Sequence, residues 1–390
     1  MKINIFPIVS SLHQGERINY ETQTLLNELS GHENFIFNIC NINELYDADL
    51  SLILIQSGGS EQYFLDNLSQ LKEPFYLLTY GSNNSLAASL EILSYIKDKN
   101  LEGEVLHGSS SYIAKRMLEL AKEKKKKEVK RFGVIGRPSD WLIASNVNYD
   151  DAKRIHNIEL IDIDIEELIN QYNNLNYQDL KFDTDFDQKE MNNAYKLYKS
   201  IELIKNKYKL EGLTIRCFSL LDSIKTTACL GLALLNKDKI CSSCEGDVPT
   251  LISMQILKNI TGQVGFQANP SKIDIENKKM IFAHCTLPLD MTSSYKYDTH
   301  FESGIGVAIK GELKEEKITI FKLSNNLKDY YVTTGKIIRN LNHNNLCRTQ
   351  IEVEVDNNIE YFLNRPYGNH HVIIYGDYKK EIDNYFKKQV

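Results

Sequence analysis

The sequence of 390 residues lacks several features that would indicate a membrane or nucleic-acid partner. No window approaches the roughly 20 apolar residues that cross a bilayer. The apolar run before Ser10 is interrupted by Asn4 and Pro7 and is too short for a secretory signal. Positive charge is not in excess, since 46 Lys and Arg stand against 52 Asp and Glu, whereas binding to nucleic-acid phosphates needs an excess. We therefore expect a cytoplasmic protein with no membrane or nucleic-acid partner.

Common catalytic and nucleotide-binding motifs are also missing. Neither GxxxxGK[ST] nor GxSxG occurs, which removes the usual evidence for nucleotide chemistry and serine hydrolysis. Gly133-Val-Ile-Gly136 follows an apolar run but lacks a third glycine, so it does not support a dinucleotide-binding turn.

The seven cysteines are an odd number in a long chain without an export signal, which favours reduced thiols. Cys241-Ser-Ser-Cys244 has the spacing of a redox pair or of half a zinc site. A zinc site needs a second close pair, whereas Cys285 and Cys347 are isolated. We favour the interpretation that these cysteines are small buried hydrophobes.

The first third of the chain alternates short apolar runs with amphipathic stretches, which is typical of a parallel sheet covered by helices. The expected strands are 3–9, 35–39, 51–56, 75–79 and 105–107, and the expected helices lie near 20–29 and 84–97. This pattern predicts a flavodoxin-like or Rossmann-like domain over residues 1–130.

The basic run KEKKKKEVKR is a solvated helix face or linker and marks a domain boundary. A second α/β pattern follows over residues 131–265. After Thr261 the segments alternate in polarity or run apolar between turns, which indicates antiparallel β structure. The predicted fold class is α/β: two doubly wound parallel-sheet domains, 1–130 and 131–265, followed by a β-rich C-terminal domain, 266–390.

Acidic residues stand at the end of a strand of the second domain. Glu245-Gly246-Asp247 follows the apolar-to-small run 239–244 and precedes Val248-Pro249 and a helix. Ligand sites of α/β folds lie at this end of the strands, and the glycine allows both carboxylates to face one point. Capping of the following helix explains the same residues without a ligand, so both interpretations stay open.

Two histidine positions add candidate ligands. His284 lies within the expected strand MIFAHCT, and His370-His371 leads into the strand 372–375. Neutral imidazole is the commonest metal ligand, and with carboxylates it suits Mn²⁺, Fe²⁺, Zn²⁺ or Mg²⁺. A single histidine in a strand is also compatible with an ordinary core or surface role.

Trp141, the only tryptophan, follows a strand end, where it either stacks on a sugar face or packs in a core. Arg216 lies in a strand that points to the same region. If a substrate carries an anion, Arg216, Arg137 and Lys225 are the groups available to pair with it.

Together these segments resemble the L-fucose and L-arabinose isomerase superfamily, most closely its fucose isomerase-like members. The likeness covers most of the chain. Its best points are TYGSNNSLAASLEIL, GLTIRCF, CEGDVPTLISMQILKNITG, IFAHCT, HFESGIG, LCRTQIEVEV and YGNHHVIIYGD.

The resemblance implies a divalent metal, most often Mn²⁺, and a set of residues around it. It places metal ligands on Asp247, Asp222 and His370, with His284 as an additional ligand, and makes the two aspartates catalytic. Of the two adjacent histidines, the resemblance indicates His370 rather than His371 as the metal ligand. Asp222 stands where the family has glutamate. The expected substrate-binding residues are Asn369, Glu245, Trp141 and Arg216.

The resemblance further implies an intramolecular oxidoreductase that interconverts an aldose and a ketose through a cis-enediol, and a homo-oligomer. A base moves a proton between C1 and C2 while a metal stabilises the charge on the carbonyl oxygen. Two alternatives remain at this point: a sugar-binding protein without catalysis, and a redox or zinc protein centred on Cys241 and Cys244.

Overall fold

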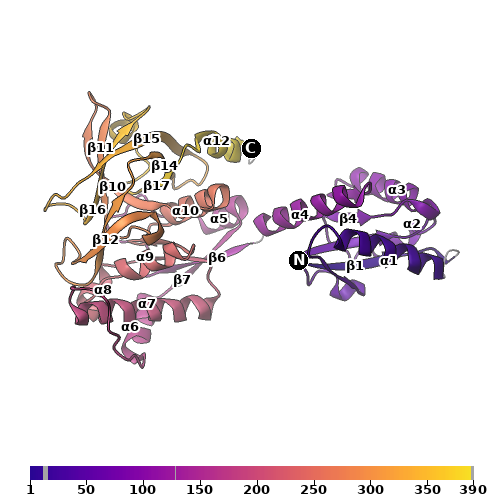
Figure 1. Cartoon of the computed structure of the whole chain (residues 1–390), viewed down its shortest axis with the longest axis horizontal. Helices are drawn as coiled ribbons and strands as arrows, with labels where there is room; N and C mark the ends of the chain where they lie inside the picture. The colour runs from indigo at the N-terminus through magenta and orange to yellow at the C-terminus, as the bar shows by residue number, and fades with distance from the viewer. Residues whose placement is uncertain (12–15, 128, 388–390) are drawn as a thin grey trace. The chain divides into compact units, whose positions relative to one another are not determined.

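The computed structural model describes residues 1–11, 16–127 and 129–387. The chain forms two compact units, Met1–Glu128 and Val129–Val390, which we describe separately (Figure 1). Within the described ranges, no helix combines the length and apolar character that crossing a membrane requires.

The first unit is built on a five-stranded parallel sheet of order β2-β1-β3-β4-β5. Its strands are β1 (Lys2–Ile8), β2 (Ile36–Ile39), β3 (Leu50–Ile55), β4 (Phe75–Leu78) and β5 (Gly103–Leu106). Its helices are α1 (Glu16–Ser30), α2 (Glu61–Asn67), α3 (Ser85–Asp98) and α4 (Ser110–Lys127), with short 3-10 turns η2 (Ile42–Glu44) and η3 (Ser82–Asn84).

Alternation along the strands gives this sheet two apolar faces. Leu52 and Leu54 pack with α1 and α4, whereas Ile53 and Ile55 pack with α2 and α3. Helices therefore cover both faces, which explains why the strands read as continuous apolar runs.

The second unit begins with a four-stranded parallel sheet of order β7-β6-β8-β9. Its strands are β6 (Lys130–Ile135), β7 (Ile158–Ile163), β8 (Gly212–Ile215) and β9 (Cys241–Cys244). Its helices are α5 (Tyr149–His156), α6 (Ile165–Asn174), α7 (Gln188–Tyr208), α8 (Ser219–Ile224), α9 (Cys229–Lys237) and α10 (Val248–Thr261). β8 ends at Ile215, and α8 begins at Ser219, directly after Phe218.

The rest of this unit is a closed antiparallel barrel of order β10-β11-β16-β15-β14-β17. The strands are β10 (Phe266–Asp274), β11 (Lys279–His284), β14 (Lys317–Leu323), β15 (Tyr330–Asn340), β16 (Thr349–Val355) and β17 (His371–Tyr375). A separate hairpin pairs β12 (Thr292–Asp298) with β13 (Ala308–Leu313), and η4 (Leu289–Met291), α11 (Tyr361–Asn364) and α12 (Lys379–Lys387) complete the unit.

The predicted order, parallel sheets and then antiparallel strands, is confirmed. Helix α10 packs against β9 of the sheet and against β14 and β17 of the barrel (Figure 1). The amino end of α10 therefore lies where the sheet meets the barrel. A division of this unit into separate domains at residues 265 and 266 stays a prediction.

All seven cysteines are free, and six are buried. Cys241 packs with α10 in one apolar core, whereas Cys244 belongs to the core on the opposite face of the sheet. The Sγ atom of Cys244 lies instead 3.0 Å from that of Cys217. Cys241 and Cys244, on which the cysteine-centred alternative was based, therefore do not form a facing pair.

Candidate metal centre

The turn between β9 and α10 places two carboxylates at the carboxyl end of the parallel sheet. Glu245 and Gly246 both have left-handed backbone conformations, with φ of 63° and 75°. A Cβ atom on Gly246 would lie 2.4 Å from the carbonyl oxygen of Arg137. Only glycine fits this close approach, so the sequence Glu-Gly-Asp fixes where both acids point.

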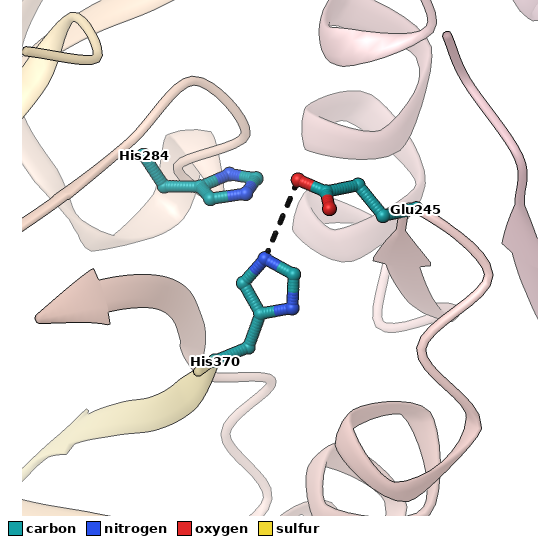
Figure 2. Close-up of side chains that lie close together, drawn as sticks. All are labelled: Glu245, His284 and His370. Carbon is teal, nitrogen blue, oxygen red and sulfur yellow. Dashed lines mark ion pairs between the residues drawn. The ribbon is translucent and has the colours of Figure 1, made fainter. Parts of the chain in front are cut away.

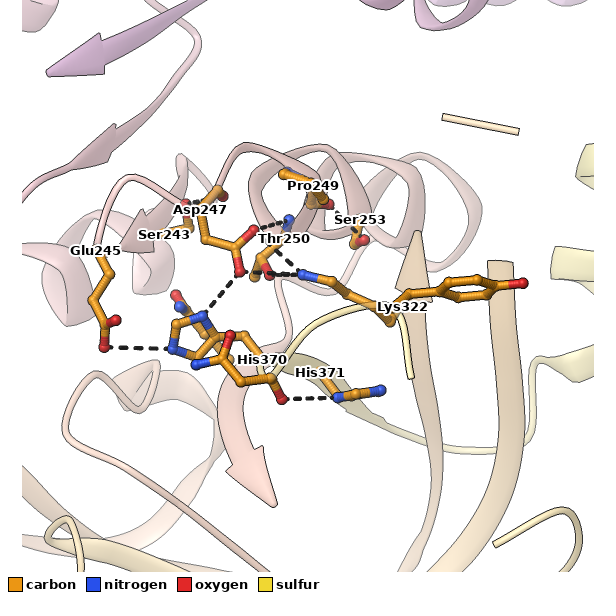
Figure 3. A network of polar contacts seen from close by, with 12 residues as sticks. Ser243, Glu245, Asp247, Pro249, Thr250, Ser253, Lys322, His370 and His371 are labelled. Carbon is orange, nitrogen blue, oxygen red and sulfur yellow. Dashed lines mark hydrogen bonds and ion pairs between the residues drawn. The ribbon is translucent and has the colours of Figure 1, made fainter. Parts of the chain in front are cut away.

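Asp247 caps α10, as the capping interpretation predicts. Its Oδ1 accepts a hydrogen bond of 2.9 Å from the backbone N–H of Thr250. Lys322 of β14 donates to both carboxylate oxygens, over 3.3 and 3.1 Å, and His370 Nδ1 lies 2.9 Å from Oδ2 (Figure 3). Burial alone would raise the pKa of Asp247, but the charge of Lys322 and the contact with His370 lower it. Asp247 is therefore a buried anion whose two oxygens are already occupied.

His370 is fully buried just before β17 and connects the two acids. Its Nδ1 faces Asp247, and its Nε2 points to Glu245, 3.5 Å from Oε1. This Nε2 is buried without a hydrogen-bond partner. Burial disfavours the charged imidazole, but the two carboxylates raise the pKa of His370 to about 9.

Glu245 is held from the other side by Trp141, whose indole N–H donates to Oε2 over 2.8 Å. Burial would raise the pKa of Glu245, but His370 and the Trp141 N–H lower it to about 2. The two acids together with Lys322 and the charged His370 thus form a balanced set of two anions and two cations in the interior.

His284 completes a group of three donors. It lies at the end of β11, with its ring centroid 5.3 Å from that of His370, and its Nδ1 is 2.8 Å from Thr286 Oγ1. Burial and the neighbouring His370 lower the pKa of His284 to about 3, so its imidazole is neutral. Figure 2 shows Glu245, His284 and His370 pointing toward one another.

The donor set fits a metal ion. One ligand atom from each of Glu245, His284 and His370 lies within 4.8 Å of the others. Two ligands of one ion with bonds of about 2.1 Å are at most about 4.2 Å apart, so small side-chain adjustments suffice. The neutral His284 offers a lone pair as it stands, and His370 offers one at Nε2 once that atom has lost its proton.

The other predicted site residues lie in different surroundings. Asp222 is on α8 with a fully exposed side chain, 4.0 Å from Lys225 Nζ, and the structure does not bring it to the group. Asn369 Nδ2 donates to Asn269 Oδ1 over 3.0 Å. Arg216 pairs with Asp140 and donates to the carbonyl oxygen of Pro138 over 3.1 Å.

The adjacent His371 faces away from the group. Its Nδ1 lies 3.0 Å from the carbonyl oxygen of Asn369, and its Nε2 lies 3.1 Å from Tyr361 Oη. Burial and the charge of Lys322 lower the pKa of His371 to about 3. Successive residues at the start of a strand point to opposite sides, which separates the two histidines.

Sequence reasoning missed Lys322 and His300. In the strand KITIFKLS, Lys322 lies on the same face as Ile318 and Ile320, which pack in the barrel core. A lysine at such a buried position indicates a buried acidic partner. His300, between β12 and β13, contacts the ring of Phe218, which contacts Trp141 edge-on at 4.9 Å. Burial lowers the pKa of His300.

Comparisons with known proteins give one consistent similarity. No protein-family model matches the chain. The chain is 25% identical over 179 residues to the sulfoquinovose isomerase of Priestia megaterium and over 202 residues to that of a Clostridium species. These alignments cover 43% and 48% of the chain. The chain spans 40% and 44% of the length of these relatives.

Proposed function

We propose that the chain is a metal-dependent aldose–ketose isomerase that acts on a sugar or a sugar derivative through a cis-enediol. The observation that carries the proposal is the buried Nε2 of His370, which has no hydrogen bond and faces Glu245 and His284. A buried polar atom without a partner costs free energy, which a metal ligand bond would recover. The similarity to sulfoquinovose isomerases supports the reaction class.

The proposed ligands are Glu245, His284 and His370, each through an atom of the donor group. A carboxylate with two imidazoles suits several transition metals, and Mn²⁺ is the first ion to test. When bound, the metal supplies Lewis-acid stabilisation of negative charge on the sugar oxygens. To act as a ligand, His370 gives up its Nε2 proton, because a metal ligand must offer a lone pair.

Asp222 and Asp247 receive different roles from those implied by the resemblance. We propose that Glu245 takes the place assigned to Asp222, since the exposed Asp222 lies outside the group. Asp247 orients His370 through Nδ1, because both of its oxygens are occupied. A carboxylate behind a ligating histidine is a common arrangement in metal sites.

We propose His300 as the group that carries the proton. Its imidazole is largely neutral at neutral pH because burial lowers its pKa, so it can accept a proton. The imidazole removes the proton from C2 of the aldose and returns it to C1, while the O2 hydroxyl proton passes to O1. This balances the conversion of aldose to ketose.

The substrate is proposed to lie beside Trp141. The indole is half exposed although its N–H is bound to Glu245, so a ring face beside the donor group is available for stacking on a sugar. Asn369 precedes His370. Arg216, which pairs with Asp140 and bonds to the carbonyl oxygen of Pro138, is the cation proposed for an anionic substituent. Sulfoquinovose is the first substrate to test, in view of the relatives' names. A homo-oligomeric state and a cytoplasmic location stay predictions.

The test is isomerisation in deuterium oxide by the Mn²⁺-loaded full chain. We expect turnover of a sugar with deuterium incorporated at C2 of the recovered aldose, and loss of turnover with a chelator. His300→Asn should retain metal binding but lose deuterium exchange. A protein that binds sugars without metal and turns over none of a broad panel would favour the sugar-binding alternative.

A further inference from the structure

Lys322 is a lysine in the interior of the second unit, with 1% of its side chain exposed. It lies on β14 on the side of the strand that carries Ile318 and Ile320. Its ammonium group contacts Asp247 at both oxygens and donates to Thr250 Oγ1 over 2.6 Å. Three short contacts therefore use the three donors of the ammonium group.

A buried ammonium group is costly unless it is paired and hydrogen-bonded. A hydrophobic residue would fill this position of the barrel strand without that cost. The position of Lys322 is thus unexplained by packing of the barrel and calls for a role at the carboxylate that it contacts.

The contacts form a continuous chain from the barrel to the donor group. The Lys322 ammonium and the Thr250 N–H hold Asp247 from one side, which leaves Oδ2 directed at His370 Nδ1. Because Nδ1 is fixed by that contact, the opposite atom Nε2 is directed at Glu245. Figure 3 shows this line from Lys322 through Asp247 and His370 to Glu245.

We propose that Lys322 is a positioning residue of the metal centre: by fixing the Asp247 carboxylate, it holds His370 Nε2 in place for a metal ion. The inference rests on the metal centre proposed above. Substitution of residues behind metal ligands typically weakens metal affinity about 10–100-fold, and Lys322 acts one contact further from the ligand than Asp247.

Whether removal of Lys322 weakens or tightens cation binding distinguishes a positioning role from simple charge repulsion. A fixed positive charge near a cation site opposes cation binding, so charge alone predicts that removing Lys322 tightens the site. Positioning predicts the opposite, because an unrestrained Asp247 no longer fixes the His370 ring.

The experiment is calorimetric titration of the full chain with Mn²⁺, comparing wild type with Lys322→Met. We expect about 10-fold weaker binding by Lys322→Met. The matched control is Lys317→Met on the same strand, where an exposed lysine pairs with Asp377 over 2.9 Å; it should bind as wild type does. Unchanged or tighter binding by Lys322→Met would overturn the inference.

A double-mutant cycle tests the route of the effect. In an Asp247→Asn background, Lys322→Met should change the Mn²⁺ affinity by less than about 2-fold, since coupled residues do not act additively. An equal loss in both backgrounds would indicate a merely structural role and overturn the proposal. The Asp247→Asn background also removes the buried negative charge, which in Lys322→Met would keep only His370 as a counter-ion.

If Lys322→Met does not fold, Lys322→Arg gives a second test. It keeps the charge, but the planar guanidinium cannot reproduce the contacts of a compact ammonium group, so weaker Mn²⁺ binding is expected and unchanged affinity contradicts the inference. If wild type binds no divalent metal, both the metal centre and the role of Lys322 are wrong. If wild type binds and Glu245→Gln does not, while Lys322→Met and Lys322→Arg bind normally, only the inference fails.

Discussion

The carboxyl edges of the two parallel sheets carry different kinds of polar side chain. At the carboxyl edge of the first sheet, hydroxyl groups bind to one another and to backbone: Ser57 Oγ accepts from the N–H of Ser10, Ser60 donates to the carbonyl of Ser57, and Thr79 donates to Ser85. At the same edge of the second sheet stand the buried anions Glu245 and Asp247. Neutral groups can satisfy one another locally, whereas buried charges need counter-ions.

The barrel supplies those counter-ions. Lys322 lies on β14, and His370 immediately precedes β17. His284 is the last residue of β11. The parallel sheet alone therefore provides the place for a site, and the barrel packed beside its edge provides the charge balance and two of the three donors. The following variants test this difference, in order of decreasing effect.

Asp247→Ala should produce the largest loss of stability. It leaves Lys322 buried without its counter-ion, and breaking a buried pair typically costs about 3–5 kcal/mol. Urea unfolding followed by circular dichroism measures the change. A loss of stability below about 1 kcal/mol would contradict the prediction. It would mean that charge pairing at the edge of the second sheet contributes as little as the neutral groups at the edge of the first.

Glu245→Gln should abolish high-affinity metal binding. The amide keeps the size of the side chain but loses the charge that faces His370, and we expect at least about 100-fold weaker Mn²⁺ binding, or about 2.7 kcal/mol. Titration calorimetry measures the affinity. The control is Glu211→Gln at the opposite end of β8, where an exposed glutamate pairs with Lys130; equal losses in both variants would contradict the prediction.

Gly246→Ala tests whether the turn directs the acids. Gly246 and Gly262 both have φ of 75°, but only Gly246 is crowded by backbone; a Cβ on Gly262 meets nothing within 4 Å. We expect Gly262→Ala to cost about 1 kcal/mol for the backbone conformation. Gly246→Ala should cost more and also weaken Mn²⁺ binding. Equal unfolding midpoints for the two variants would refute the role of the close approach.

Ser60→Ala should have the smallest effect. It removes one hydrogen bond, from Ser60 to the carbonyl of Ser57, at the edge of the first sheet, which typically contributes about 1 kcal/mol. Mn²⁺ affinity should stay within the error of the calorimetric measurement. A marked loss of metal binding would show that the first unit takes part in the site.

The sequence predicts the sheets well because their signals are local. Continuous apolar runs flanked by amphipathic helices identify the parallel strands, and alternation such as that of Ile351, Glu352 and Val353 identifies barrel strands. Glu245, Asp247, His284 and His370 all belong to the residues selected from the sequence, and the structure brings them together.

The roles within that group are less accessible from sequence. Spacing cannot show that Lys322 occupies both oxygens of Asp247, because the contact joins residues 75 positions apart. The selection of Asp222 relied on its distance upstream in the chain, and only the fold shows that α8 turns this side chain to solvent. A residue's place on a helix surface decides its exposure, which a motif alone does not determine.

The barrel order has a consequence for how the protein is made. The last strand, β17, pairs with β10 and β14, and His370 immediately precedes it. A ribosome must release the polypeptide through β17 before this strand can join its neighbours. The three donors of the proposed metal centre therefore come together only when β17 has closed the barrel. A polypeptide that ends before His370 lacks one of these donors.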